Sequence, residues 1–149
     1  MRNALAPFER SGGEGPYQIQ YDLQDMMQAH AGIVRHHKDL TIAAEKLQDL
    51  KKRAAQVSVS GNREYNPGWH TALDLQNLLT VSEALVLSGL DRKESRGGHF
   101  REDHPEKKED HAKHNAVIRR DPRNGEMQML RVPIPPMPEE LRKVIEENK

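Results

Sequence analysis

Residues Arg92–Pro105 read RKESRGGHFREDHP, the most informative stretch of the chain. It follows a long apolar pattern of helical spacing and holds four basic residues, three acids, two histidines and the pair Gly97-Gly98. A segment this polar is not a core element, because unpaired charges are costly to bury. The central glycines permit backbone conformations that other residues avoid. The sequence therefore predicts a sharply bent loop whose charges are held by partners.

Apolar residues lie mainly between Ile19 and Leu90 and recur at steps of three and four, the spacing of helices with one buried face. Three helices are predicted: from residue 17 to the basic cluster at 35–38, from about 39 to 57, and from about 69 to 90. The cluster at 35–38 fits the carboxyl end of the first helix, where cations oppose the helix dipole. Short links between the helices favour an up-down-up bundle.

The two ends of the chain have a different character. Residues 1–16 contain two prolines and three glycines, which favours a tether without regular structure. Residues 115–120 and 126–132 are extended candidates around the turn-forming sequence DPRNG, and they predict a short β-hairpin. A proline-rich segment follows, and Pro138 suits the start of a final helix. The predicted fold is all-α: a three-helix bundle over 17–105 and an irregular extension over 106–149 that carries the hairpin and the terminal helix.

Composition excludes several classes of function. The formal net charge is zero, which argues against a nucleic-acid binder that works through a basic surface. The chain has no cysteine, which excludes disulfides, thiolate metal sites and a cysteine nucleophile. No apolar run approaches the roughly 20 residues that span a bilayer, and the first residues lack the apolar core of a signal peptide. We therefore expect a soluble, cytoplasmic chain without direct membrane insertion.

The charged residues and histidines suggest three kinds of chemistry: arginine–carboxylate pairing, metal binding and acid–base catalysis. Arg96 and Arg101 can pair with carboxylates through two hydrogen bonds each, whereas the plainer reading is a solvated charged loop. His111 and His114 have a spacing that can hold a metal on a helix, but no third ligand is specified, so we expect no metal site. Adjacent acids such as Glu102 and Asp103 are usually solvated or ion-paired rather than catalytic. No nucleotide-binding or hydrolase motif is present in the sequence.

The loop resembles the ESRG-x-H-x-R-x-D-x-P segment of the flavoprotein subunits of succinate dehydrogenase and fumarate reductase. Further similar pieces occur in the same order along the helices. These are Gly15–Tyr17 with Asp22–Met27, Gly32–Arg35, Leu75–Leu79 and Ala84–His99. The likeness extends over about residues 5–105, whereas the proline-rich end departs from the better-known forms. Aspartate oxidase, a relative built on the same plan, is a competing assignment.

The resemblance implies a spectrin-repeat-like three-helix bundle that forms the C-terminal domain of such a subunit. It implies that FAD lies in the parent subunit, that this chain holds no cofactor, and that it is not active alone. The implied partners are a flavin-binding domain, of the same or a split subunit, and an iron–sulfur subunit, with the parent complex at the inner face of the cell membrane. A free-standing helical assembly module is the alternative. No catalytic residue is carried over; the residues expected to form a structural and interface loop are Arg92, Glu94, Ser95, Arg96, Gly97, His99, Arg101 and Asp103.

Overall fold

A computed structural model describes residues 2–148 of the chain and divides them into two compact units that meet between Lys107 and Lys108. The first unit holds four helices and a pair of two-residue strands, and the second holds a β-hairpin flanked by two short helices. The described chain is therefore predominantly helical, as predicted, although it is not purely so. In the described range no helix has the length and the hydropathy needed to cross a membrane.

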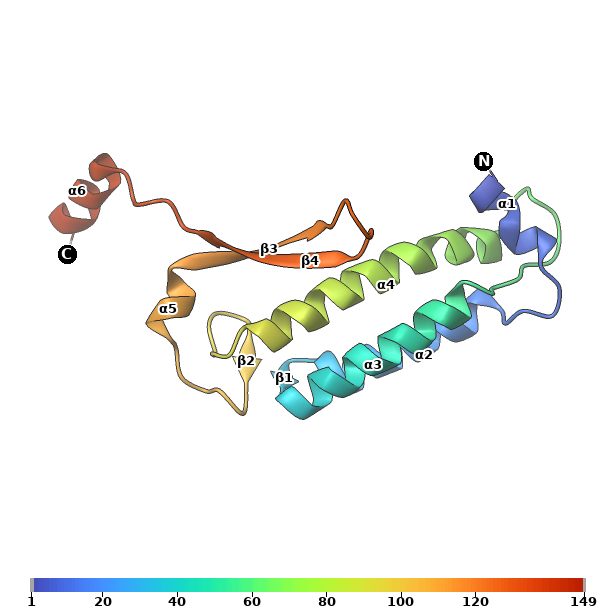
Figure 1. Ribbon diagram of the computed structural model, residues 1–149, viewed down its shortest axis with the longest axis horizontal. Coiled ribbons are helices and arrows are strands. Elements are labelled where there is room, and N and C mark those ends of the chain that lie inside the picture. The colour runs from blue at the N-terminus through green and yellow to red at the C-terminus, as the bar shows by residue number, and fades with distance from the viewer. Residues whose placement is uncertain (1, 149) are drawn as a thin grey trace. The chain divides into compact units, whose positions relative to one another are not determined.

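Three long helices build the first unit: α2 (Pro16–Ala31), α3 (His37–Ala54) and α4 (Pro67–Asp91). Each packs against the other two, and α3 runs opposite to α2 and α4 (Figure 1). Their facing sides form one apolar core. Its most deeply buried members are Ile19, Leu40, Ala43, Leu47, Val57, Leu75, Leu79 and Val86.

Local chemistry accounts for where these helices begin. Pro16 and Pro67 occupy the first turns of α2 and α4, where the missing amide hydrogen costs nothing and the fixed φ suits a helix. Asn66 caps α4, since its Oδ1 accepts a hydrogen bond from the Trp69 amide at 3.0 Å. The ring of His36 caps α3 by accepting from the Lys38 amide at 3.1 Å.

The prediction that residues 1–16 lack regular structure is wrong for Arg2–Glu9, which form helix α1. Its partner is Trp69, whose Nε1 donates to the Ala4 carbonyl oxygen at 2.6 Å and whose ring lies 5.5 Å from that of Phe8. Helix α1 packs on α4 in this way. A tertiary contact therefore stabilises a helix that has a proline, Pro7, inside it.

The predicted end of the first helix is also wrong. Helix α2 stops at Ala31, with Gly32 as its C-cap, and the next residues form strand β1 (Val34–Arg35). His37 and Lys38, placed by the sequence pattern at the end of that helix, instead open α3. Because the helix ends early, Ile33 leaves the apolar stripe and is 82% exposed.

Strand β1 pairs in parallel with strand β2 (Phe100–Arg101), which lies within the 92–105 loop. The register sets Val34 opposite Phe100 and Arg35 opposite Arg101. This pair departs from the predicted all-α fold, and two-residue strands carry too little periodicity to be recognised in a sequence. It attaches the loop to the link between α2 and α3, at one end of the helical unit (Figure 1).

The second unit contains helix α5 (Glu109–Ala112), strands β3 (His114–Arg120) and β4 (Met127–Pro133), and helix α6 (Glu139–Glu147). The two strands pair antiparallel from His114 opposite Pro133 to Arg120 opposite Met127, which confirms the predicted hairpin. Gly125 has φ +75° in the turn, a conformation that favours glycine. Helix α6 begins one residue after Pro138, close to the predicted start.

Candidate functional site

The 92–105 loop contains a tight turn at its tip. Arg96 and His99 exchange two backbone hydrogen bonds, of 2.9 and 3.1 Å, across the Gly97-Gly98 pair. Gly97 has φ +59°, and positive φ at the first central residue is the feature that makes glycine the favoured residue there in type II′ turns. Both glycines are exposed, and a Cβ on either one would meet nothing within 4 Å. The tip is therefore held from inside the loop while its outer surface stays open.

Glu94 is fully buried, and arginine donors surround its carboxylate. Arg92 Nη1 donates to Oε1 at 2.6 Å, and Arg96 donates from Nε at 2.9 Å and from Nη2 at 3.1 Å. Buried charges are tolerated when they are paired and hydrogen-bonded in this way. The carboxylate of Glu94 thus gathers two arginines at the base of the turn.

Ser95 joins the two halves of the loop. Its Oγ accepts from the Arg101 amide at 2.8 Å and lies 2.9 Å from the His104 carbonyl oxygen, to which the hydroxyl donates. Its amide donates to the Glu106 carbonyl oxygen at 3.2 Å. Ser95 therefore ties the first half of the loop to strand β2 and to the residues that follow it.

Arg101 is the largest fully buried side chain in the described part of the chain. Its Nη1 donates to the Gly89 carbonyl oxygen at 2.6 Å and to that of Arg92 at 3.3 Å. Carbonyls in the last turn of a helix have no partner within the helix, and a cation there opposes the helix dipole. Arg101 thus caps the carboxyl end of α4 from within the core.

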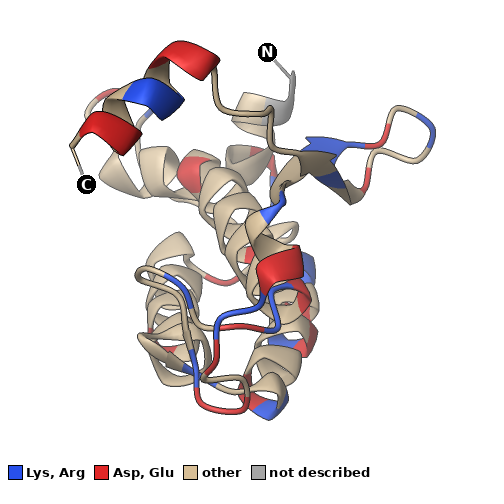
Figure 2. Cartoon of the chain, turned by 90° about the vertical axis from the view of Figure 1, so that its left-hand side faces the viewer, with Lys and Arg blue, Asp and Glu red and all other residues tan. Residues whose placement is uncertain are grey.

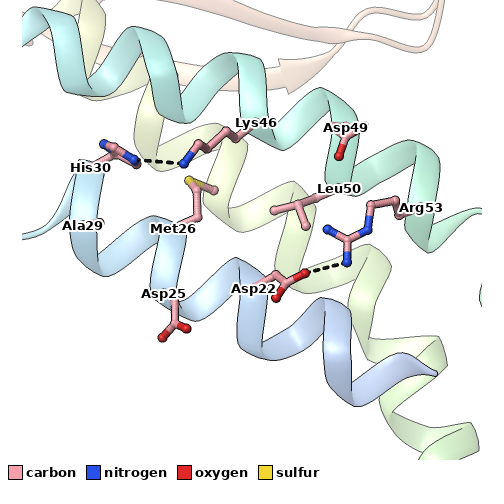
Figure 3. A pocket seen from close by; sticks show the side chains of 9 residues that line it. All are labelled: Asp22, Asp25, Met26, Ala29, His30, Lys46, Asp49, Leu50 and Arg53. Atoms are coloured by element: carbon pink, nitrogen blue, oxygen red, sulfur yellow. Dashed lines mark hydrogen bonds and ion pairs between the residues drawn. The ribbon is translucent and has the colours of Figure 1, made fainter. Parts of the chain in front are cut away.

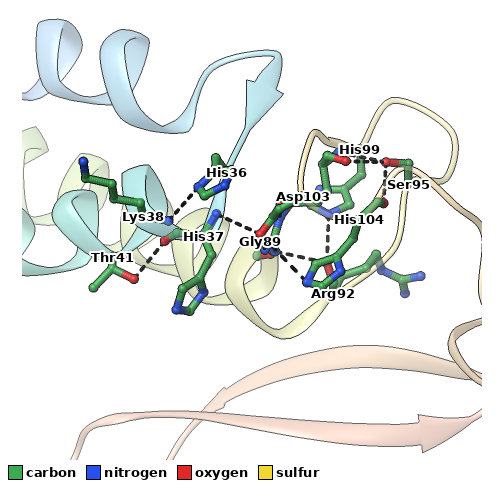
Figure 4. Close-up of polar contacts among 11 residues, drawn as sticks. His36, His37, Lys38, Thr41, Gly89, Arg92, Ser95, His99, Asp103 and His104 are labelled. Carbon is green, nitrogen blue, oxygen red and sulfur yellow. Dashed lines mark hydrogen bonds and ion pairs between the residues drawn. The ribbon is translucent and has the colours of Figure 1, made fainter.

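Asp103 completes a bridge between two helix ends. Arg101 donates to both of its carboxylate oxygens, from Nε and from Nη2, at 2.7 Å each. Asp103 Oδ2 also accepts from the amide of His37, the first residue of α3, at 3.1 Å (Figure 4). The hydrogen bonds from Arg101 hold the pKa of the Asp103 carboxyl well below its usual range. The pair therefore sets a cation on the end of α4 and an anion on the start of α3, as both dipoles favour.

His99 connects the loop to strand β1. Arg35 Nη1 lies 2.9 Å from His99 Nδ1, and His99 Nε2 lies 3.2 Å from the Arg92 carbonyl oxygen. Arginine can only donate and a carbonyl can only accept, so Nδ1 is the acceptor and Nε2 carries the proton. Burial, together with the nearby charges of Arg35, Arg101 and Arg92, lowers the pKa of the His99 ring. The loop therefore holds a neutral imidazole.

Because the pKa of His99 is lowered on folding, we expect it to make stability depend on pH. Below about pH 6.5 the unfolded chain takes up the proton first, so stability falls as the pH drops, with a slope of at most about 1.4 kcal/mol per pH unit. Urea unfolding at pH 7.5 and 5.5 measures the loss. In His99→Gln the loss between the two pH values should be smaller than in the wild type. Equal losses would contradict a neutral His99.

A second candidate is an open cavity of about 470 Å³ between α2 and α3. Figure 3 shows its lining, which mixes acids and bases from the two helices. Arg53 pairs with Asp22 and Glu14, and the Lys46 ammonium lies 3.2 Å from His30 Nε2. Both cations are therefore already bound by neighbouring side chains. None of the site residues predicted from the sequence lines this cavity. The 92–105 loop is the stronger candidate.

The structure brings seven of the eight predicted loop residues into one hydrogen-bonded cluster, and the eighth, Gly97, forms the turn at its tip. Figure 2 looks onto this end of the helical unit and shows basic and acidic residues interspersed rather than segregated. Sequence reasoning did not assign Arg35, His37 and Gly89 to the loop's contacts, although they link the loop to strand β1, to α3 and to α4 respectively. The sequence did offer a signal for Arg35, which belongs to the basic cluster at 35–38 expected at the carboxyl end of the first helix. In the structure Arg35 Nε donates to the Gly32 carbonyl at 2.8 Å and so caps the end of α2.

The histidines of the second unit do not share a helical face. His111 belongs to α5 and His114 opens β3, so the spacing that suggested a helical metal pair does not apply. Their ring centroids lie 5.5 Å apart, and the rings pack against each other. Within the described residues no group of three or more histidines and acids is arranged to hold a metal ion.

Comparison with known proteins identifies the family to which this architecture belongs. The family model described as fumarate reductase flavoprotein C-term matches residues 20–144. The chain belongs to this family. The fumarate reductase flavoprotein subunit of Mycobacterium tuberculosis is 35% identical over 111 residues, which are 74% of this chain and 19% of that protein. L-aspartate oxidase 2 of Ralstonia nicotianae is 39% identical over 88 residues, 59% of this chain and 15% of that protein.

Among solved structures, the Mycobacterium smegmatis Sdh1 in complex with UQ1 superposes with a TM-score of 0.90 at 37% identity. The match covers 99% of this chain and 25% of that one. The chain thus spans about a fifth of the curated relative it matches, in a domain that corresponds to the C-terminal part of a flavoprotein subunit.

Proposed function

We propose that this chain is the non-catalytic C-terminal domain that supports the flavin-binding part of a succinate dehydrogenase or fumarate reductase flavoprotein. In the full enzyme the parent subunit holds FAD and interconverts succinate and fumarate. The observation that carries the proposal is the braced 92–105 loop. Its charges pair internally around Glu94 and Asp103 while the Gly97-Gly98 tip stays open. Such a loop can present a rigid surface without taking part in chemistry.

The residues of the chain do not fit FAD themselves. The sequence has no glycine-rich dinucleotide motif, and the sheets in residues 2–148 are two-stranded, one with two-residue strands and the other a hairpin. A dinucleotide site of the common kind needs a parallel sheet followed by a helix whose amino end meets the phosphates. We therefore assign the cofactor to the remainder of the parent subunit.

The proposal also includes the type of helix bundle, a second partner subunit and the cellular location of the parent complex. The alternating directions and shared core of α2, α3 and α4 support a spectrin-repeat-like bundle. An iron–sulfur subunit is the proposed second partner, and the parent complex is proposed to hold the domain at the inner face of the cell membrane. The similarity to chains of succinate dehydrogenase and fumarate reductase complexes supports both assignments.

A pull-down tests the proposal. The purified chain is immobilised and exposed to lysate of its source organism, and the eluate is read by flavin absorbance and mass spectrometry. The expected result is capture of a yellow flavoprotein of the same family that lacks this helical domain. Capture of helical assembly factors without flavin, or of no flavoprotein at all, would contradict a supporting role toward a separate flavin-binding chain.

A further inference from the structure

Helix α6 has one apolar face, and the described chain leaves that face uncovered. Leu141 is 56% exposed, Val144 54% and Ile145 46%, and α6 has no buried residue. A helix turns about 100° per residue, so these three side chains lie within about 100° of one another around its axis. We call Leu141, Val144 and Ile145 the α6 face. With nine residues, α6 is too short to be stable alone in water, so its stability depends on packing of this face.

The unit that carries α6 has no apolar core of its own. The buried core residues of the described chain run from Ile19 to Val86, all in the first unit. Within residues 108–148 the only buried residue is Asp121, which is polar, and Val117 and Val132 of the hairpin are 39% and 41% exposed. An isolated two-stranded hairpin is only marginally stable. The second unit therefore needs a packing surface that its own residues do not provide.

An acidic edge borders the α6 face. Glu140 and Glu147 are four and three residues away from Val144, so both lie beside it on the same side of the helix. Among the described residues neither glutamate makes an ion pair. The other edge differs, because Arg142 already pairs with Glu139, with 3.7 Å between Nη1 and Oε2. The unpaired charge beside the face is therefore negative, and a covering surface that carries lysine or arginine complements it.

We infer that α6 docks by its apolar face into an apolar groove on the flavin-binding part of the flavoprotein, and that lysine or arginine side chains border this groove along the Glu140–Glu147 edge. An amphipathic helix that lays its apolar face in a groove is a recurring mode of recognition between proteins. This inference rests on the proposed function and names a contact through which the second unit joins the parent subunit. The match to the Mycobacterium smegmatis Sdh1 chain covers 99% of this chain, so the counterpart of this region is tethered to the remainder of a larger polypeptide. Tethering raises the effective concentration of that remainder above that of a separate subunit.

A lipid surface is a poorer occupant of the α6 face. Helices that lie on membranes are rich in lysine and arginine on their polar face, which attracts them to anionic lipids. Helix α6 has four glutamates against one arginine and one lysine. Figure 2 shows the acidic residues at both ends of α6 and the basic residues between them. Anionic headgroups would therefore repel the helix.

A second copy of the chain is also a poorer occupant. In an antiparallel pair of α6 helices related by two-fold symmetry, each edge faces the same edge of the other copy, so Glu140 lies opposite Glu147. In a parallel pair the acidic edge faces the edge that holds Pro138 and Ile145, where there is no cation. Neither arrangement compensates the charge of the two glutamates. Charge complementarity thus favours a basic groove over self-association.

Two charge reversals that differ only in their position around the helix test the inference. The edge variant, Glu140→Lys/Glu147→Lys, reverses the acidic edge, whereas the control variant, Glu139→Lys/Glu146→Lys, makes the same change in net charge on the side opposite Leu141. Each variant changes one residue at either end of α6, so the effects on the helix dipole are matched. In the same pull-down at low ionic strength, we expect the edge variant to reduce flavoprotein capture at least about tenfold and the control variant to change it less than about twofold. Circular dichroism melting of both variants confirms that each one folds.

The outcomes separate the two proposals. Loss of capture in the edge variant alone, with normal melting, supports the basic groove. Undiminished capture by the edge variant, or equal loss in both variants, would overturn the groove while capture by the wild type still supports the proposed function. Binding of the wild type to vesicles of phosphatidylcholine and phosphatidylglycerol, or a wild-type dimer that Val144→Lys dissociates, would assign the α6 face to lipid or to a second copy and overturn the groove as well. Failure of the wild type to capture any flavoprotein would overturn the proposed function, and the groove with it.

Discussion

Replacing Arg101 with methionine is expected to lower the free energy of unfolding by about 3–5 kcal/mol, the range measured when one partner of a buried ion pair is removed. Arg101 is fully buried, and methionine fills much of its volume, so the loss is chiefly electrostatic. The substitution leaves Asp103 without the donor that meets both of its oxygens. It also leaves the Gly89 carbonyl, at the end of α4, without its 2.6 Å hydrogen bond.

Urea unfolding followed by circular dichroism at pH 7.5 measures this loss. Arg63→Met is the matched control, because Arg63 is exposed in the link between α3 and α4, and it should change stability by less than about 0.5 kcal/mol. A domain of this size has a free energy of unfolding of about 5–15 kcal/mol. The Arg101→Met variant should therefore unfold at a clearly lower urea concentration than the wild type, or be unfolded without urea. Similar midpoints for the two variants would show that the Arg101 bridge between the helix ends contributes little.

A double-mutant cycle locates the source of the effect. If the cost comes from the charge left on Asp103, then Asp103→Asn should be less harmful in the Arg101→Met background than in the wild type. We expect the double variant to be more stable than the sum of the single losses predicts. Additive losses would instead assign the effect of Arg101 to the carbonyl oxygens of α4.

The helical unit shows what the sequence can predict. Apolar steps of three and four located α3, α4 and the start of α2 to within a few residues, because each helix buries one stripe of side chains. Leu78 and Leu85 of α4 also follow this spacing, although both are 38% exposed. Periodicity assigns a face to a residue, but it does not set the width of the buried stripe.

The loop shows where sequence reasoning stops. Pairing of Arg96 and Arg101 with carboxylates was predictable, and each pairs with an acid two residues away, Glu94 and Asp103. The contact from Asp103 to the His37 amide joins residues 66 positions apart, and no local pattern encodes it. Helix α1 is a similar case, since it depends on the distant Trp69.

Glu94→Gln is expected to lower the free energy of unfolding by about 2–3 kcal/mol, less than Arg101→Met. Glutamine keeps the shape of Glu94 but removes the charge that two arginines approach. Glutamine also replaces one carboxylate oxygen with an NH2 group, which faces the N–H donors of the arginines. Because position 94 is fully buried, water cannot come between these donor groups. The cost stays below that of a fully buried pair because the side chains of Arg92 and Arg96 are 24% and 35% exposed and can turn toward solvent.

Glu102→Gln is the control for this variant, since it makes the same change at an exposed position of the same loop and should shift stability by less than about 0.5 kcal/mol. Urea unfolding gives both values, and amide hydrogen exchange of Arg96 and His99 reports on the turn that they close. We expect Glu94→Gln to speed exchange at both amides, because Arg96 loses the anion that fixes its side chain. Unchanged exchange together with unchanged stability would mean that the Gly97-Gly98 turn holds its shape without Glu94.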